Sequence, residues 1–593
     1  MSNFFKELKR RNVIKETLAY LVVSWVLLQV ASIILPIVNA PDWVLKTVTF
    51  FLAIGFPVWI FFSWAYQVTP EGLKKTRKIS EDQTITTATN KRLNIIILIT
   101  LLIAIGVSFV NKSRPEASLK TSISITEKSI AVLPFDDYSS GGDTEWFCNG
   151  VAEDIRTNLS KIKGITKVIS HTSVEKFKNF DKTIPEIAKE LGVSYILEGN
   201  VRKHKDKIII TAKLIDANDN QIWAENYSDN FDKVFEIQND VSKKIVKQLK
   251  IVISPKEEKV LNTQITNNFE AYELYLRGRH LWNQQNTESI KRSIEYLEES
   301  IKLDSTFAPA YVILAEDYIL MNKFVPNNKE KLIHRKKCHE AIDKAIELDN
   351  SLAEAYITKG NMISKFDWNW EEMKKMLEKG LQIEPNNSYA HMLLSKYYLI
   401  KNNFNKAIEE ALLAEKLDPL NPRIGSFVAK NYFIANNYKR SIDQYEKVLK
   451  LSPNYVFAWE GVGHVQYFSG QKETAQISWG KFLGDMGNEK MADIYSNESF
   501  DNSISYWLEG AIKEEELYCS NPTVIAQAHM FIDKKQGALE YLEVAYKYRN
   551  EDLPIYLLEP HFYSLYNEPR FIDIVKKTGV ILPDLKQEFK IVD

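Results

Sequence analysis

The chain has 593 residues, which is too long for a single hydrophobic core and predicts several domains. Its 76 Lys and Arg residues almost balance its 77 Asp and Glu residues, so the composition gives no electrostatic reason to expect nucleic acid or an anionic substrate as a partner. The three cysteines are scattered singly, which argues against a disulfide framework and against a zinc finger.

Three apolar stretches lie in the first fifth of the chain, at residues 18–38, 47–66 and 93–110. Each is close to the ~20 residues that a helix needs to cross a bilayer, so we expect three transmembrane helices in a membrane region 1–110. A buried hairpin of a soluble domain is the alternative for the first two.

The orientation of these helices is predicted from their basic flanks. Basic residues precede the first stretch and fill the connection 67–92, and the positive-inside rule places both in the cytoplasm. We therefore expect a multi-pass protein of a bacterial inner membrane whose large C-terminal part lies in the periplasm. If the third stretch does not span, that part is cytoplasmic instead.

A compact α/β domain is expected after a polar linker at 111–128. Between residues 129 and 253, short apolar runs alternate with helical patterns in the order β-α-β-α-β-β-β-α. The clearest strands are Val193–Arg202 and Lys207–Asp216, which are joined by a charged hairpin. Their apolar residues predict a core large enough to fold alone.

The second half of the chain is repetitive. Pro385, Pro419 and Pro453 each follow a helical pattern and recur at intervals of 34 residues. This period is typical of tetratricopeptide (TPR) repeats, in which two antiparallel helices per unit stack into a curved solenoid. We expect a TPR array at 269–487, followed by a degenerate helical, TPR-like region at 488–593.

Candidate binding residues lie at inward positions of the first helices of these repeats. The predicted groove comprises Met392, Lys396, Ser426, Lys430 and His464. Two lysines at equivalent positions would attract an acidic segment of a partner protein, although the asparagines that accompany them in carboxylate-binding TPRs are absent. The alternative interpretation is a charged stripe that faces solvent.

Several segments together resemble bacterial membrane proteins that carry a TolB-like domain before TPR repeats. The resemblance rests on SIAVLPF, IAKELGVSYILEGNVRK and AKLIDANDNQIWAENY in the α/β region, and on EPHFYSLYNEPRFIDIVKKTGV near the C-terminus. Some relatives carry a cyclase or a winged-helix DNA-binding domain before the membrane, and segment 1–17 is too short for either. Where the family has FSDG, this chain has FCNG at 147–150.

No catalytic signature is found in the sequence, which lacks the motifs of a phosphate-binding loop, a zinc protease and a serine hydrolase. We expect no catalytic residue, no cofactor and no metal site. The predicted function is a non-catalytic, membrane-anchored scaffold or adaptor that binds proteins or peptide segments through the TPR concave face and the TolB-like domain. The alternative is a signalling or sensory component, related to the regulatory part of membrane cyclases or transcription regulators but without their catalytic or DNA-binding domain.

Overall fold

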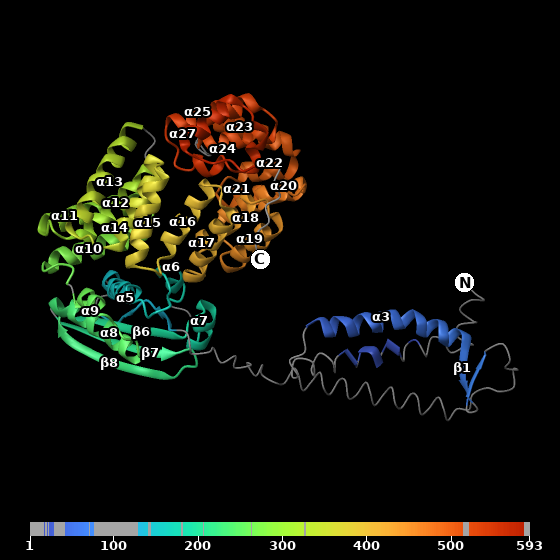
Figure 1. Ribbon diagram of the computed structural model, residues 1–593, viewed down its shortest axis with the longest axis horizontal. Coiled ribbons are helices and arrows are strands. Elements are labelled where there is room, and N and C mark those ends of the chain that lie inside the picture. Colours follow the sequence, from blue (N-terminus) through green and yellow to red (C-terminus); the bar gives the residue numbers. More distant parts are fainter. Residues whose placement is uncertain are drawn as a thin grey trace. The chain divides into compact units, whose positions relative to one another are not determined.

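The computed structural model (Figure 1) has two compact units, Met1–Thr121 and Ser122–Asp593. In the larger unit it describes residues 128–585, except for 140–143, 179–181, 205–206, 263, 325–327 and 514–520. In the smaller unit it describes residues 42–69 and 72–75, together with 17, 20, 21, 23–25, 27 and 28.

The smaller unit contains α3 (Asp42–Ala65), followed by an antiparallel hairpin of β1 (Tyr66–Thr69) and β2 (Gly72–Lys75). None of the helices in the described part of the chain is both long enough and apolar enough to cross a membrane. The transmembrane helices predicted as part of the fold class are therefore wrong. Two further predictions depended on these helices and are withdrawn: the multi-pass inner-membrane location and the periplasmic placement of the C-terminal part.

A sequence window counts apolar residues and does not show where a helix begins and ends. Of the predicted span 47–66, α3 covers all but the last residue, and Tyr66 begins β1. Within α3, Pro57 removes a backbone hydrogen bond from the helix interior. The predicted spans 18–38 and 93–110 and the predicted linker 111–128 lie outside the described residues except at a few positions.

The larger unit begins with a mixed β-sheet and its helices. The strands are β3 (Ser129–Val132), β4 (Asp136–Asp137), β5 (Lys167–Val168), β6 (Tyr195–His204), β7 (Lys207–Asp216) and β8 (Gln221–Asn230). The helices are α5 (Glu145–Ser160), α6 (His171–Glu175), α7 (Ile184–Leu191), η2 (Phe231–Lys233) and α8 (Val234–Gln248). The sheet order is β5-β3-β6-β7-β8, with β4 beside β6; β3, β5 and β6 are parallel, and β6, β7 and β8 form an antiparallel meander.

Both faces of this sheet are covered, because its strands alternate apolar side chains between two cores. On one face, α5 and α8 pack over Ile208 and Ile210 of β7. On the other face, α7 packs over Ala131 and Ile196. The predicted order of strands and helices is found, with the short β4 and α6 as additions.

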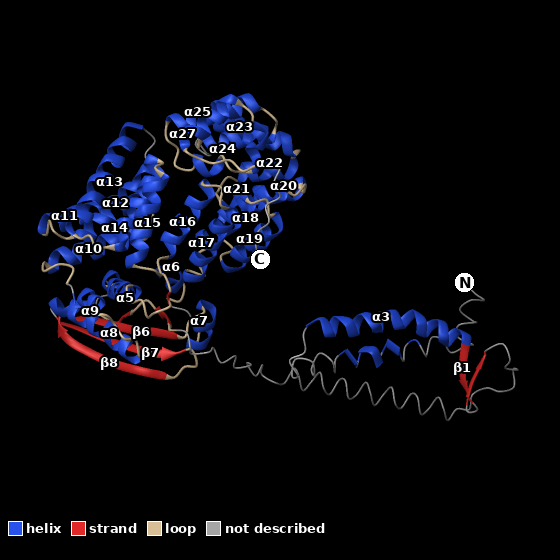
Figure 2. Ribbon diagram, viewed as in Figure 1, coloured by secondary structure: helices blue, strands red, loops and turns tan. Residues whose placement is uncertain are grey.

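The rest of the larger unit is helical (Figure 2). Its first part comprises α9 (Pro255–Asn262), α10 (Phe269–Trp282), α11 (Thr287–Leu303), α12 (Ala308–Phe324), α13 (Asn328–Leu348), α14 (Ala353–Met362), η3 (Ile363–Asp367), α15 (Trp370–Ile383), α16 (Ser388–Ile400), α17 (Phe404–Leu417), α18 (Pro422–Ile434), α19 (Tyr438–Leu451), α20 (Val456–Phe468) and α21 (Lys472–Asp485). Its second part comprises α22 (Glu489–Asn497), α23 (Phe500–Ile512), α24 (Pro522–Phe531), α25 (Lys535–Lys547), α26 (Leu553–Tyr556), η4 (Pro560–Leu565) and α27 (Pro569–Thr578).

From α10 to α21 the helices stack as antiparallel pairs, and the first helices of successive pairs also contact one another. Small residues allow this close packing where two helices cross. A Cβ atom added at Gly360 would lie 2.8 Å from Leu377 Cδ2, and one added at Gly463 would lie 2.4 Å from Trp479 Nε1. The arrangement confirms the predicted TPR-type solenoid, whose units bury their apolar faces only against neighbouring units.

After α25 the chain crosses back over the solenoid. Residues 549–561, which we call the C-terminal strap, contain α26 and the start of η4, and α26 contacts α16. Arg549 fastens one end, since its guanidinium lies 4.9 Å from the ring centroid of Trp368 and donates a hydrogen bond to the Asp367 carbonyl at 3.1 Å. Leu557 and Leu558 are completely buried, so the strap is part of the folded core.

Candidate functional site

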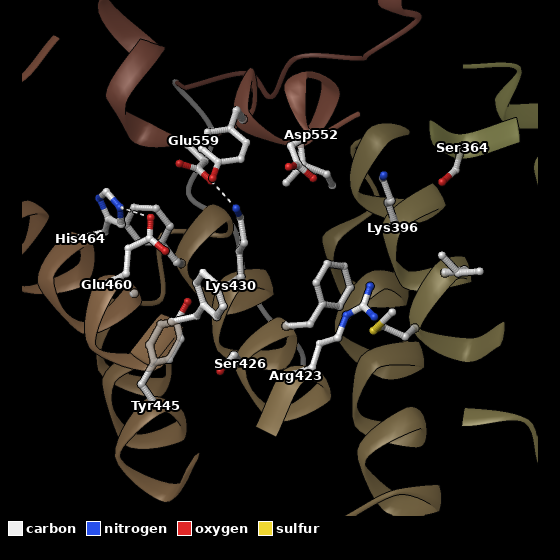
Figure 3. Close-up of a pocket in the computed structure, with 18 of the residues that line it drawn as sticks. Ser364, Lys396, Arg423, Ser426, Lys430, Tyr445, Glu460, His464, Asp552 and Glu559 are labelled. Carbon is white, nitrogen blue, oxygen red and sulfur yellow. Dashed lines mark ion pairs between the residues drawn. The ribbon is translucent and has the colours of Figure 1, made fainter. Parts of the chain in front are cut away.

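A cavity of about 330 Å³ lies between the strap and the first helices of the TPR pairs. All five residues of the predicted groove, Met392, Lys396, Ser426, Lys430 and His464, contribute to its lining. Figure 3 shows Lys396 and Lys430 extending from the solenoid toward Asp552 and Glu559 of the strap. The repeat spacing thus brings together residues that are far apart along the chain.

The capped N-termini of α16 and α18 explain why Lys396 and Lys430 lie in a row. α16 and α18 begin after Asn387 and Asn421, whose side chains accept hydrogen bonds from the backbone N–H groups of Ala390 and Arg423, both at 3.0 Å. Such a cap fixes where a helix begins. Because each lysine follows its capping Asn by the same number of residues, Lys396 and Lys430 reach equivalent places on neighbouring helices.

Two further lysines lie near this row. The charges of Lys323 on α12 and Lys365 in η3 act on each other, and the charge of Lys365 also acts on Lys396. We call Lys323, Lys365, Lys396 and Lys430 the basic row. The first two have no signal in the sequence, because they do not follow the 34-residue spacing.

The strap supplies carboxylates to the basic row. Lys430 Nζ lies 2.8 Å from the carboxylate of Glu559, and Lys365 forms an ion pair with Glu551. Burial by itself would raise the pKa of both glutamates, but the neighbouring lysines lower each to about 2. Both glutamates are therefore ionised at neutral pH, and the basic row holds an acidic segment of its own chain.

A hydrogen-bonded relay extends from Glu559 into an aromatic cage. Glu559 contacts His561 Nδ1 at 3.2 Å, and His561 Nε2 lies 3.0 Å from His464 Nδ1. The ring of Phe531 stacks against His464 at a centroid distance of 5.9 Å. Burial lowers the pKa of His561 to about 4, so this ring is neutral at neutral pH and serves to position Glu559.

Some polar groups that line the cavity have no ion-pair or hydrogen-bond partner on the strap. Within the described residues, Lys396 has no ion-pair partner, and burial together with the nearby Lys365 charge lowers its pKa to about 8. The Ser364 hydroxyl and the Asn361 Oδ1 atom are buried without a hydrogen-bond partner in the described structure, as is the Ser426 hydroxyl. These groups can bind a further polar ligand group.

A second cavity, of about 1020 Å³, lies between α5 and α6 of the α/β region and the solenoid. Asn361, Lys365 and Arg423 line both cavities, so the two are continuous. Its other charged lining residues are Glu145, Glu153, Arg156, Glu175, Lys176, Arg279, Glu316, Lys323, Glu354, Glu384 and Asp418. The junction of the two regions therefore forms a charged groove rather than a closed interface.

Ion pairs neutralise only part of this second cavity. Arg279 lies 2.8 Å from Glu153 and 3.4 Å from Asp154. By contrast, neither Glu316 nor Glu354 has an ion-pair partner among the described residues; Glu316 accepts a hydrogen bond from Thr358 at 2.8 Å. Burial, opposed by the Thr358 hydrogen bond and reinforced by the charge of Glu354, raises the pKa of Glu316 to about 7.

Comparison with known proteins finds partial matches. Residues 126–252 match the family model of the second domain of HilA/YgeH-like transcriptional regulators. A protein named putative adenylate cyclase 3, from Rhizobium meliloti (strain 1021), is 34% identical over 221 residues. That match covers 36% of this chain and 37% of the relative, so this chain spans little more than a third of that protein's length.

Solved structures are similar to parts of this chain. The crystal structure of MamA is similar with 16% identity and a TM-score of 0.24, covering 27% of this chain and 94% of MamA. That of YrrB, described as a TPR protein with an unusual peptide-binding site, has 20% identity and a TM-score of 0.25, covering 33% of this chain and 95% of YrrB. Similarity at this level carries no inference about what this chain binds.

Proposed function

We propose that the chain is a non-catalytic scaffold that binds an acidic segment of a partner protein in the groove along the basic row. The observation that supports this proposal is the strap, which places Glu551 and Glu559 against Lys365 and Lys430. The groove thus already accommodates carboxylates on an irregular segment. TPR-type solenoids present such extended concave surfaces for binding.

The unpaired part of the basic row gives a partner segment a place to bind. Lys396 has a lowered pKa because it is partly buried near Lys365, and an added carboxylate would raise that pKa again. Binding and protonation of Lys396 therefore favour each other. The ligand also gains hydrogen bonds to the Ser364 and Ser426 hydroxyls, which have no partner in the described structure.

The proposal can be tested with fluorescent peptides of about twelve residues, a length suited to a solenoid groove. One peptide carries several glutamates and its match carries glutamines at the same positions. We expect the full chain to bind the glutamate peptide at least about tenfold more tightly in anisotropy titrations. Lys396→Ala should remove this preference, whereas Lys439→Ala, at an exposed position of α19, should retain it. Equal binding of the two peptides by the unmodified chain would refute the proposal.

A second candidate function is a sensory component in which the α/β region changes the binding properties of the solenoid. It is favoured by the match of residues 126–252 to a domain of transcriptional regulators. The two regions share direct contacts: Ser173 Oγ donates a hydrogen bond to Asp418 at 2.5 Å and accepts one from the Leu420 backbone N–H at 2.8 Å.

The two candidates differ in what Ser173→Ala does. A simple scaffold keeps its affinity for the glutamate peptide when this contact is removed, because Ser173 does not line the basic row. A coupled sensor changes that affinity, since two linked sites must influence each other's binding energy. Anisotropy titration of the variant distinguishes the two, with Ser496→Ala on α22 as a control distant in sequence from the contact.

A further inference from the structure

The groove changes charge along its length, from carboxylates at Glu316 and Glu354 to the lysines of the basic row. We infer that the bound partner segment is bipolar: it places a Lys or Arg side chain against Glu316 and Glu354 and, about three residues away, an acidic side chain against the basic row. This inference rests on the proposed function and specifies the chemistry of its ligand.

The charge change follows a single helix face. Glu354, Thr358, Asn361 and Lys365 are spaced four, three and four residues apart along α14 and η3, and all four line the second cavity. Residues at this spacing lie on one side of a helix. Along this face the side chains change from anionic, through neutral polar, to cationic.

The neighbouring helix α12 repeats the pattern. Glu316 and Lys323 are seven residues apart and both line the second cavity. Two helical turns separate them, which corresponds to a rise of roughly 10 Å. Two parallel faces with the same polarity give the groove a defined acidic end and a defined basic end.

Among the described residues, no cation lies within ion-pair distance of Glu316 or Glu354, although the charge of Arg279 acts on both. Arg279 itself forms ion pairs with Glu153 and Asp154. The only hydrogen bond recorded for the carboxylate of Glu316 in the described residues comes from Thr358. Burial and the charge of Glu354 raise the pKa of Glu316 more than the Thr358 hydrogen bond and the charge of Arg279 lower it.

An unpartnered oxygen gives independent support. Asn361 is 6% exposed, and its Oδ1 atom has no hydrogen-bond donor in the described structure. It lines the groove between the acidic end and the basic row. Leaving such an acceptor buried without a donor costs about 1–3 kcal/mol, so the site favours a ligand with N–H groups. An ammonium or guanidinium group provides both the donors and the positive charge that Glu316 and Glu354 lack.

The separation of the two ends sets the ligand spacing. An extended chain advances about 3.3 Å per residue, so the rise of roughly 10 Å from Glu316 to Lys323 corresponds to about three residues. The eleven residues from Glu354 to Lys365 give a rise of roughly 16 Å, or about five residues of extended chain. A segment with a basic and an acidic residue separated by two others therefore fits Glu316 and Lys323 at once. A ligand that carries only acidic residues would place like charge beside Glu316 and Glu354, so it is not the best occupant.

The test uses four fluorescent peptides with the cores KAAE, QAAE, KAAQ and QAAQ in a common Gly-Ser flank, together with the reversed core EAAK, and the full chain. We expect the better of KAAE and EAAK to bind at least about tenfold more tightly than QAAE. The double substitution Glu316→Gln and Glu354→Gln should reduce this lysine-dependent gain to less than about threefold. Glu347→Gln, on the exposed side of α13 where the side chain is 70% exposed, should leave the gain unchanged.

The outcomes separate this inference from the proposed function. If QAAE binds as tightly as both KAAE and EAAK, and if Lys396→Ala abolishes the binding of QAAE, the proposed acidic-segment scaffold stands and the bipolar inference is refuted. If no peptide binds, both fail. Because the comparison of KAAE with QAAE changes only the peptide, it remains decisive even if the double variant does not fold.

Discussion

The two ends of the groove differ in whether their buried and partly buried charges have ion-pair partners. At the basic row, Lys365 and Lys430 are paired with the strap glutamates Glu551 and Glu559, whose side chains are 15% and 3% exposed. At the acidic end, Glu316 and Glu354 have no ion-pair partner in the described residues, although the charge of Arg279 acts on both. A buried ion pair whose partners are both within the chain holds the fold together, whereas a partly buried carboxylate without one is a candidate for ligand binding.

The largest effect should come from breaking the paired end. Glu559→Ala leaves Lys430 and His561 without their shared carboxylate, and removing one partner of a buried pair typically costs about 3–5 kcal/mol. We expect the urea midpoint to fall and proteolysis to begin in the strap. Glu543→Ala, which breaks an exposed pair with Arg570, should cost no more than about 1 kcal/mol. Similar losses for the two variants would show that the strap is not held by its charges.

A smaller loss is expected when a helix crossing is overpacked within the solenoid. In Gly463→Leu the new side chain meets Trp479, since even a Cβ atom at this position would lie 2.4 Å from the indole nitrogen. Overpacking costs about 1–3 kcal/mol and in a solenoid acts locally. We expect proteolysis to start within residues 456–487 while residues 130–250 remain resistant.

The control for this prediction is Gly484→Ala, where the added Cβ would lie 3.3 Å from the Ala492 Cβ and needs only a small adjustment. Limited proteolysis followed by mass spectrometry locates the first cuts. Wild-type resistance of Gly463→Leu would contradict the helix register that also aligns Lys396 with Lys430.

Features set by local sequence were predictable, and those set by distant contacts were not. In α7 both ends are set locally, because Thr183 and Glu186 form a capping box at its start and Gly192 takes a φ of 62° at its end. The predicted groove residues lie close together because residues 34 apart in the sequence occupy equivalent positions on neighbouring repeats. Glu551 and Glu559 had no sequence signal, since the strap is more than 100 residues from the lysines it pairs with.

The acidic end was missed for the same reason. Glu316 and Glu354 lie on different repeats at positions that do not match each other in the 34-residue frame. The membrane prediction failed although the apolar composition of 47–66 was clear: α3 covers this stretch up to Ala65 and β1 begins at Tyr66, but no helix in the described residues is both long and apolar enough to cross a membrane. Composition alone did not determine where a helix ends.

The acidic end should also make stability depend on pH. The pKa of Glu316 is raised to about 7 from 4.5, so the folded state binds more protons than the unfolded state between these values, and stability falls as the pH rises through 7. The groups facing Glu316 are Arg279 on α10 and Glu354 and Thr358 on α14. Relative to wild type, Glu316→Gln should gain about 1–2 kcal/mol between pH 5 and pH 8, after allowance for partial solvent access.

Urea unfolding at the two pH values measures this difference, and Glu347→Gln serves as the exposed control. A Glu316→Gln variant that follows the wild-type pH dependence would mean that its carboxylate is already compensated. In that case the acidic end would resemble the basic row, and the contrast between the two would disappear.

The smallest effect on stability is expected at the lysine left unpaired by the strap. Lys396→Ala removes no ion pair and no hydrogen bond recorded in the described structure, and its partly buried charge is opposed by Lys365. Losing the packing of its methylene groups offsets the relief of that repulsion, so the urea midpoint should shift by less than about 1 kcal/mol. Affinity for the glutamate peptide should nevertheless fall by about tenfold, because the ligand loses its charge partner. A large stability loss with unchanged peptide binding would reassign Lys396 from the binding groove to the support of the fold.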